Sequence, residues 1–231
     1  MSYTKKDFER FRSNELKKTD TFRFECQMCG RCCRSKSEPI IVTGFDVFRF
    51  SKALNMPLRD SLKLNCEMYL GDSSHVPVFV LSERMDGSCR LMRKGKCMVQ
   101  EDKPTVCAIF PLGRFYNGET EQYHYFMNEG NRCPGTKADY EWKLSDWLEN
   151  FRIEESIECT AAWHKLLFGI SNVTARWDKR RVEKNAELVG IMVGLLYTNY
   201  QYDLPFVPQV EANMEIAKLY FEVKFGKKLE F

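Results

Sequence analysis

The stretch Cys26-Gln27-Met28-Cys29-Gly30-Arg31-Cys32-Cys33 places four thiols within eight residues. Two residues separate successive cysteines in most of it, so a tight turn presents neighbouring sulfurs to one point, where thiolates bind metal. Three ligands at this spacing, here Cys26, Cys29 and Cys32, are also typical of a loop that holds a [4Fe–4S] cluster and takes a further ligand from elsewhere in the chain. We therefore predict that this stretch binds metal and that the surrounding chain folds around it.

A second set of cysteines follows, each beside a turn residue or a proline: Cys89, Cys97, Cys107 and Cys133. The eight cysteines equal two four-thiolate sites, although this arithmetic does not require two. Adjacent side chains point in different directions, so Cys32 and Cys33 do not fit comfortably around one tetrahedral ion. One of them either binds a second centre or stays a free thiol. The triple spacing favours an iron–sulfur cluster, whereas the paired turns favour zinc, and spacing alone does not separate the two metals.

Composition argues against several other classes of protein. The chain has 231 residues, ten cysteines and a net charge of only +3, so we expect neither a nucleic-acid partner nor an acidic membrane surface. Its first twenty residues are charged and contain no apolar segment, and the longest apolar run, 188–197, is too short to span a bilayer. We therefore expect a cytoplasmic protein whose reduced cysteines bind metal instead of forming disulfides.

The pattern of apolar residues changes near residue 137. We expect residues 1–137 to form a small, irregular, cysteine-rich metal-binding core with short strands and helices. Residues 138–231 show helical spacing and are expected to pack on that core as a C-terminal segment, with helices at 139–151, 154–167, 178–200 and 210–225. The predicted fold class is therefore α+β.

Local signals predict several elements within the first part. Thr43 and Asp46 match a capping box that opens a helix, and Asn55-Met56-Pro57 ends it. We also expect helices at 5–18 and 58–64, strands at 76–81 and 123–127, and a turn at 93–95. Two further cysteines stand apart from the eight: Cys66 and Cys159 are each expected in a helix and are interpreted as core residues.

Two kinds of side chain accompany the cysteines. Six basic residues lie within four positions of a candidate ligand and would offset the charge of metal-bound thiolates, although each alone is typical of a solvated surface: Arg31, Arg34, Arg90, Arg93, Lys94 and Lys96. The histidines are isolated and interpreted as structural, with His124, before Cys133, as the best alternative ligand.

The ordered motifs Phe24-x-Cys-x2-Cys-Gly-x-Cys-Cys, Thr43-x2-Asp46, Cys89…Cys97…Pro104-x2-Cys107-x2-Phe-Pro and Cys133-Pro-Gly resemble the YkgJ-type cysteine-cluster family over about residues 22–136. This resemblance implies a domain that chelates zinc or iron. The family usually has arginine before the proline and often after the later cysteine, where this chain has Lys103 and Ala108.

The same cysteine region is similar to that of flagellin lysine-N-methylases, which use S-adenosylmethionine. This resemblance implies, as an alternative, a cluster-dependent group-transfer enzyme. The chain lacks a glycine-rich nucleotide-binding signature. It also lacks the C-x3-C-x2-C spacing of radical S-adenosylmethionine enzymes: Cys29 and Cys33 match its first two cysteines, but Lys36 occupies the third position. Our first hypothesis is a metal-binding protein whose centre, a [4Fe–4S] cluster or zinc, is structural or carries electrons. Catalytic residues and the identity of a protein partner or substrate are not indicated.

Overall fold

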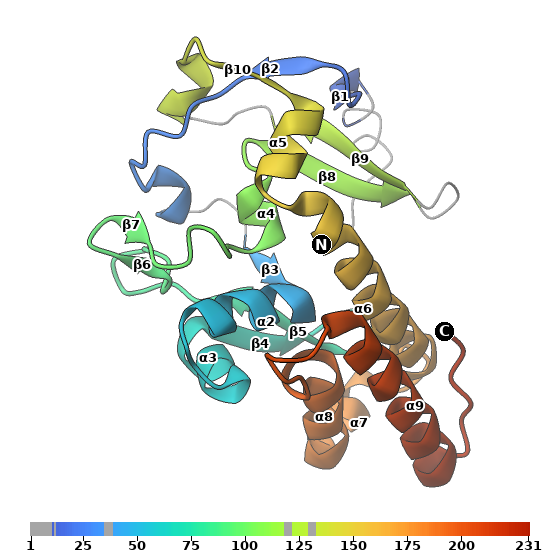
Figure 1. Ribbon diagram of the computed structural model, residues 1–231. Helices are drawn as coiled ribbons and strands as arrows, with labels where there is room; N and C mark the ends of the chain where they lie inside the picture. Colours follow the sequence, from blue (N-terminus) through green and yellow to red (C-terminus); the bar gives the residue numbers. More distant parts are fainter. Residues whose placement is uncertain (1–10, 12, 35–38, 118–121, 129–132) are drawn as a thin grey trace.

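The computed structural model describes residues 11, 13–34, 39–117, 122–128 and 133–231. Short antiparallel strands and short helices occupy most of the chain up to residue 143, and long helices follow, so the predicted α+β class is confirmed. Figure 1 shows an upper part with β8, β9, β10 and α5, and a lower part with α2, α3 and the last helices; α6 runs between them.

Most of the described helices have ten residues or fewer, and the two long ones, of 22 and 20 residues, lie in the second part. The helices are α2 (Gly44–Ala53), α3 (Leu58–Asn65), α4 (Thr105–Ala108), α5 (Leu144–Asn150), α6 (Ile153–Thr174), α7 (Lys179–Lys184), α8 (Ala186–Val193) and α9 (Phe206–Phe225). The described chain also contains two 3-10 helices, η1 (Arg31–Cys33) and η2 (Pro134–Lys137), and one π-helix, η3 (Gly194–Thr198).

The strands form four small antiparallel sheets. Their order is β1 (Glu15–Leu16), β9 (Gln122–Met127) and β8 (Leu112–Asn117) in the first; β10 (Glu141–Lys143) and β2 (Thr21–Arg23) in the second; β3 (Ile41–Val42), β5 (Pro77–Leu81) and β4 (Cys66–Leu70) in the third; and β6 (Met92–Arg93) and β7 (Lys96–Cys97) in the fourth. The β6–β7 pair is a hairpin whose turn residues, Lys94 and Gly95, both have positive φ, as a two-residue turn of this kind requires.

Two apolar cores hold these elements. The lower core joins α2, α3 and β5 to the C-terminal helices, and its fully buried members include Phe50, Ile170, Tyr197 and Phe221. The upper core joins β2, α4 and α5 and includes Phe22, Phe24, Ile109, Leu144 and Trp147. Each core therefore contains residues from both sides of position 137, and the division at that position stays a prediction.

Helix α6 connects the two cores because it is long enough to reach both. At a rise of about 1.5 Å per residue, its 22 residues span roughly 33 Å. Ile153, at its start, lies in the upper core, whereas Trp163, Leu166 and Ile170 lie in the lower one. The Trp163 indole donates to the Leu196 carbonyl, which fixes α6 against η3.

Several local predictions are confirmed. Thr43 Oγ1 accepts from the Asp46 backbone N–H and Asp46 accepts from the Thr43 backbone N–H, so the capping box at the start of α2 is complete. Helix α3 and strands β5 and β9 lie where the sequence predicts them.

Other predictions are wrong, each because pairing or a cap overrides helical spacing. The helix expected at 5–18 lies partly outside the described residues, and Glu15–Leu16 pairs with β9 as a strand. Cys66 begins β4 instead of lying in a helix, because residues 66–70 pair with all of β5. Residues 141–143 pair with β2, so the helix expected from 139 begins at Leu144.

The long helix expected at 178–200 is broken into three pieces. Asn185 leaves the helical conformation, and its side-chain oxygen caps the next helix by accepting from the Leu188 N–H. The last piece is the π-helical η3. Within the residues that the structure describes, no helix is long and apolar enough to cross a membrane.

Candidate metal centre

The cysteine loop at residues 26–33 lies against the β6–β7 hairpin. Gly30 has a φ of 67°, caps η1, and approaches the hairpin so closely that a Cβ there would lie 3.1 Å from the Gly95 carbonyl oxygen and 3.3 Å from Met92 Sδ. A side chain at position 30 would be strained by the positive φ as well. Glycine between Cys29 and Cys32 therefore lets the loop reach the segment that carries Cys97.

A remote cysteine is brought to the beginning of this loop by backbone contacts. The Glu25 N–H donates to the Gly135 carbonyl at 3.0 Å, and a Cβ on Gly135 would lie only 2.3 Å from the Glu25 carbonyl oxygen. Burial raises the pKa of the Cys133 thiol, and the neighbouring Cys29, Cys32 and Cys26 raise it further through their charge. Cys133 therefore lies with the first three cysteines, and we call Cys26, Cys29, Cys32 and Cys133 the outer group.

Cys33 turns towards a different partner. Its carbonyl accepts from the Cys89 N–H at 2.7 Å, and the next residues, Arg34 and Ser88, form an antiparallel bridge. The Cys32–Cys33 step is thus the point at which one short loop contacts two separate parts of the chain. We call Cys33, Cys89, Cys97 and Cys107 the inner group.

Arg84 holds the loop that carries Cys89. Its guanidinium donates to the carbonyls of Cys89, Arg90 and Met92 at 2.9, 2.9 and 2.6 Å. The planar fork of arginine suits several acceptors at once, so one side chain fixes the path of this loop. The sequence analysis missed this residue, because nothing local marks an arginine whose partners are backbone carbonyls.

Asp46 holds the helix that carries Cys107. Its Oδ1 accepts from both the backbone N–H and the hydroxyl of Thr105 at 2.8 Å, while its Oδ2 accepts from the backbone N–H and hydroxyl of Thr43. The carboxylate is only 3% exposed. It therefore joins the start of α2 to the start of α4, which contains Cys107, whereas the sequence indicated only the capping role.

The thiols of the inner group raise one another's pKa, and Cys32 of the outer group acts on them as well. Burial raises the pKa of Cys107 above its usual range, and Cys89, Cys32 and Cys97 add to this effect through their charge. Burial also raises the pKa of Cys97, where Cys89 is again the main charged thiol. Thiolates at these positions are unfavourable without a compensating cation.

Cys32 and Cys33 form a coupled pair with their sulfurs 3.9 Å apart. The hydrogen bond from Cys33 lowers the pKa of Cys32 to about 6, and the positive charge of Lys103 contributes to that lowering. The same contact raises the pKa of Cys33, because its proton is held between the two sulfurs. The pair thus loses one proton readily and the second only with difficulty.

Lys103 is the basic residue whose charge acts on the cysteines, lowering the pKa of both Cys32 and Cys97. It is half-buried, and its Nζ lies 4.5 Å from the centre of the Phe151 ring. The six basic residues named from the sequence are all exposed: Arg31, Arg34, Arg90, Arg93, Lys94 and Lys96. Sequence proximity pointed to them and overlooked Lys103.

The remaining candidates lie outside these two groups. Cys66 is buried in the lower core and Cys159 packs against it from α6, as the interpretation of core cysteines expected. His124 bonds to Glu15 at 2.5 Å and stacks on Phe115, which is a structural role. All ten cysteines lie in segments that the structure describes, and none of them forms a disulfide.

The donor set suits zinc or iron, because reduced thiols are the ligands that both metals take in sites built from four cysteines. Among the described residues, no three Cys, His, Asp or Glu side chains are already arranged around one point to hold an ion. A cysteine moves its sulfur between staggered positions without moving the backbone. The backbone contacts above, which bring eight thiols into two groups, are therefore the relevant evidence of fit.

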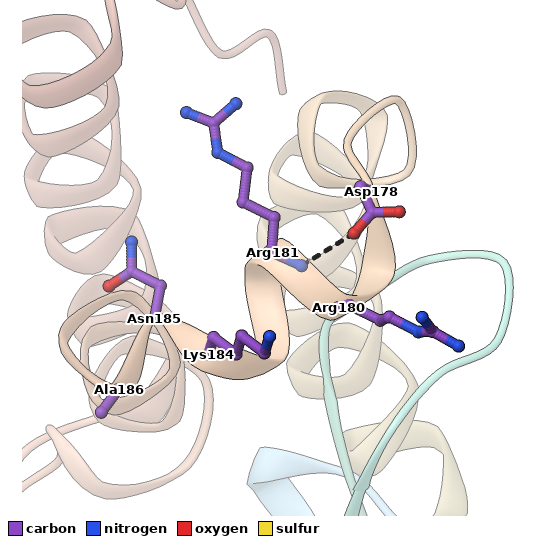
Figure 2. Close-up of a pocket in the computed structure, with 6 residues that line it drawn as sticks. All are labelled: Asp178, Arg180, Arg181, Lys184, Asn185 and Ala186. Carbon is purple, nitrogen blue, oxygen red and sulfur yellow. Dashed lines mark hydrogen bonds between the residues drawn. The ribbon is translucent and has the colours of Figure 1, made fainter.

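The described surface also has an open hollow away from the cysteines. It measures about 750 Å³ and is lined by residues of α7 and the start of α8, including Arg180, Arg181 and Lys184. In Figure 2 the two arginine side chains point away from each other, and Asp178 is occupied in capping the Arg181 N–H. This surface does not present convergent groups, so the candidate site is placed at the cysteines.

Comparison with known proteins bears on the same region. Residues 25–134 match the family model CxxCxxCC, described as a "Putative zinc- or iron-chelating domain". No curated protein and no solved structure matches the chain. The family match supports a metal-binding role for residues 25–134 and covers all eight cysteines of the two groups. The similarity to flagellin lysine-N-methylases gains no support from these comparisons.

Proposed function

We propose, starting from the match of residues 25–134 to a zinc- or iron-chelating domain, that the outer group holds a metal centre. Cys26, Cys29 and Cys32 supply three ligands, and Cys133 supplies the fourth. The observation that carries this proposal is the Glu25–Gly135 backbone bond, which joins the beginning of the cysteine loop to the segment of Cys133. Three cysteines at two-residue spacing plus one remote cysteine is the ligand pattern of a [4Fe–4S] cluster, and zinc is the alternative.

The position of the outer group favours a centre that exchanges electrons. Cys26, Cys29 and Cys32 are all exposed, so a partner protein can approach a cluster held there. Solvent exposure and nearby charge also set the potential of such a cluster. The same ligation would fix the loop to residues 133–137, so the centre has a structural role in addition, because metal-binding energy is folding energy.

The test is anaerobic purification of the full chain, followed by measurement of iron, zinc and acid-labile sulfide and by a visible spectrum. We expect iron and sulfide together with a broad absorption that bleaches on reduction. Cys26→Ser should lose the iron, whereas Cys159→Ser, on α6, should keep it. A colourless protein that carries only zinc would overturn the cluster assignment, and a protein without metal would overturn the metal-binding role.

A further inference from the structure

We propose that the inner group is a second metal site, separate from the outer one, with Cys33, Cys89, Cys97 and Cys107 as its ligands. This inference rests on the proposed function only in assigning Cys32 and Cys133 to the other site. It gives Cys33 a ligand role through its contact with Cys89. The metal that suits it is zinc, a soft divalent ion that takes four thiolates in closed structural sites.

The backbone already places two of the four ligands side by side. The Cys89 N–H donates to the Cys33 carbonyl, and the Arg34–Ser88 bridge puts Cys33 and Cys89 in adjacent positions of an antiparallel pair. Directly opposed residues in such a pair have Cβ atoms about 5 Å apart. Rotation of the two thiols can therefore bring both sulfurs to one ion.

The β6–β7 hairpin returns the chain so that Cys97 joins them. The Met92 N–H donates to the Cys89 carbonyl at 3.0 Å, and Met92 pairs with Cys97 across the hairpin. The Met98 N–H then donates to the Leu91 carbonyl at 2.8 Å. Cys89 and Cys97 are thus held at the open end of one short hairpin.

The fourth ligand is held by the Asp46 contact. Asp46 accepts two hydrogen bonds from Thr105, the first residue of α4, and Cys107 lies two residues further on in the same helical turn. Only nine residues, 98–106, separate Cys107 from Cys97, and within them the Asp102 N–H closes a turn on the Val99 carbonyl. The positions of Cys89, Cys97 and Cys107 are therefore set by contacts within residues 43–107, and Cys33 joins them through the Cys89 N–H.

Burial distinguishes this site from the outer one. Cys89 is 5% exposed, and Cys33, Cys97 and Cys107 are half-buried. Cys89 belongs to the lower core, and Cys33 and Cys97 pack against it. One buried and three half-buried thiols at the edge of an apolar core suit the closed structural type of zinc site, in which every coordination position is filled by protein.

The experiment uses the full chain, stripped of metal under reducing conditions and refilled with ¹¹³Cd²⁺, which replaces zinc or iron at thiolate ligands. We expect two cadmium resonances with the chemical shifts of four-sulfur coordination. Cys107→Ser should remove one resonance and leave the other, Cys133→Ser should do the reverse, and Cys159→Ser should leave both.

A chain without any four-sulfur resonance, or one in which Cys107→Ser changes no resonance, would overturn the second site. Because the first of these readouts needs no substitution, it holds even where a variant fails to fold. Retention of one resonance that Cys133→Ser abolishes would leave the proposed function intact while the inference fails. Loss of both resonances in either variant would show one shared centre and would also overturn the inference.

Discussion

The outer and inner cysteine groups differ in the core to which each is attached. Cys133 of the outer group packs against the upper core, and the other three outer cysteines are exposed. Cys89, in contrast, lies within the lower core, with Cys33 and Cys97 packed against it. Adjacent residues, Cys32 and Cys33, therefore belong to different parts of the molecule. The cysteine loop at residues 26–33 therefore connects the two cores. Because the groups are attached to different cores, we expect them to contribute unequally to the free energy of unfolding.

The substitution with the largest expected effect is Cys107→Ser, compared with Cys29→Ser. Loss of an inner ligand removes metal-binding energy from the larger core, so we expect the melting temperature of the metal-loaded protein to fall by about 10 °C, against about 3 °C for the outer variant. Thermal unfolding followed by circular dichroism measures both. Equal losses in the two variants would show that the groups do not differ in this way.

Asp46→Asn tests whether the inner group depends on its buried support. The amide loses the charged acceptor of four hydrogen bonds and cannot accept all of them, so we expect a loss of about 3 kcal/mol in the free energy of unfolding. The matched control is Asp86→Asn, because Asp86 also accepts from a backbone N–H and a hydroxyl, both of Ser88, but is exposed. Urea unfolding should show a clearly smaller loss for the control, and similar losses would contradict the account.

His164 gives a change in stability that is independent of either cysteine group. Burial, aided by the charge of Arg114, lowers its pKa from 6.5 to about 4. Between pH 6.5 and pH 4 this histidine is protonated in the unfolded chain and neutral in the folded chain. The free energy of unfolding therefore keeps its full value above pH 6.5 and decreases as the pH falls below it.

We expect the metal-free protein to lose about 2 kcal/mol between pH 6.5 and about pH 5 through this residue. His164→Gln should flatten that part of the stability curve, as measured by urea unfolding at each pH. If the curves of the two proteins run parallel, the histidine is not buried in its neutral form.

The smallest effect is expected from Lys103→Gln, which removes the positive charge near both groups. In the metal-free protein the pKa of Cys32 should rise only slightly, since the hydrogen bond from Cys33 is the main cause of its lowering and remains. The pH dependence of alkylation at Cys32, read by peptide mass spectrometry, measures this shift. Lys103→Arg should keep the profile of the unsubstituted chain, and a profile that is unchanged in the glutamine variant would remove Lys103 from the site.

The sequence was sufficient for features whose cause is local. Thr43 and Asp46 form the predicted capping box because its hydrogen bonds join residues three positions apart. Helices α6 and α9 cover their predicted ranges because apolar spacing is a property of the segment itself, whereas the helix predicted at 178–200 is broken. The candidate ligands could be named for the same reason, since cysteine spacing is local.

Features that depend on distant contacts were not predictable. Residues 66–70 have the composition of either element, and their pairing with β5 decides that they form a strand. The second role of Asp46 depends on Thr105, 59 positions away, and the role of Arg84 depends on carbonyls that carry no sequence signal. The assignment of Cys133 and Cys33 to different groups likewise needs the folded backbone.

The most direct test of the account is anomalous diffraction from a crystal of the metal-loaded full chain, recorded above the zinc absorption edge, where both iron and zinc scatter anomalously. The account predicts two separate peaks. One should lie among Cys26, Cys29, Cys32 and Cys133, and the other among Cys33, Cys89, Cys97 and Cys107. A single peak bound by cysteines of both groups, or peaks that contact none of these eight residues, would contradict it.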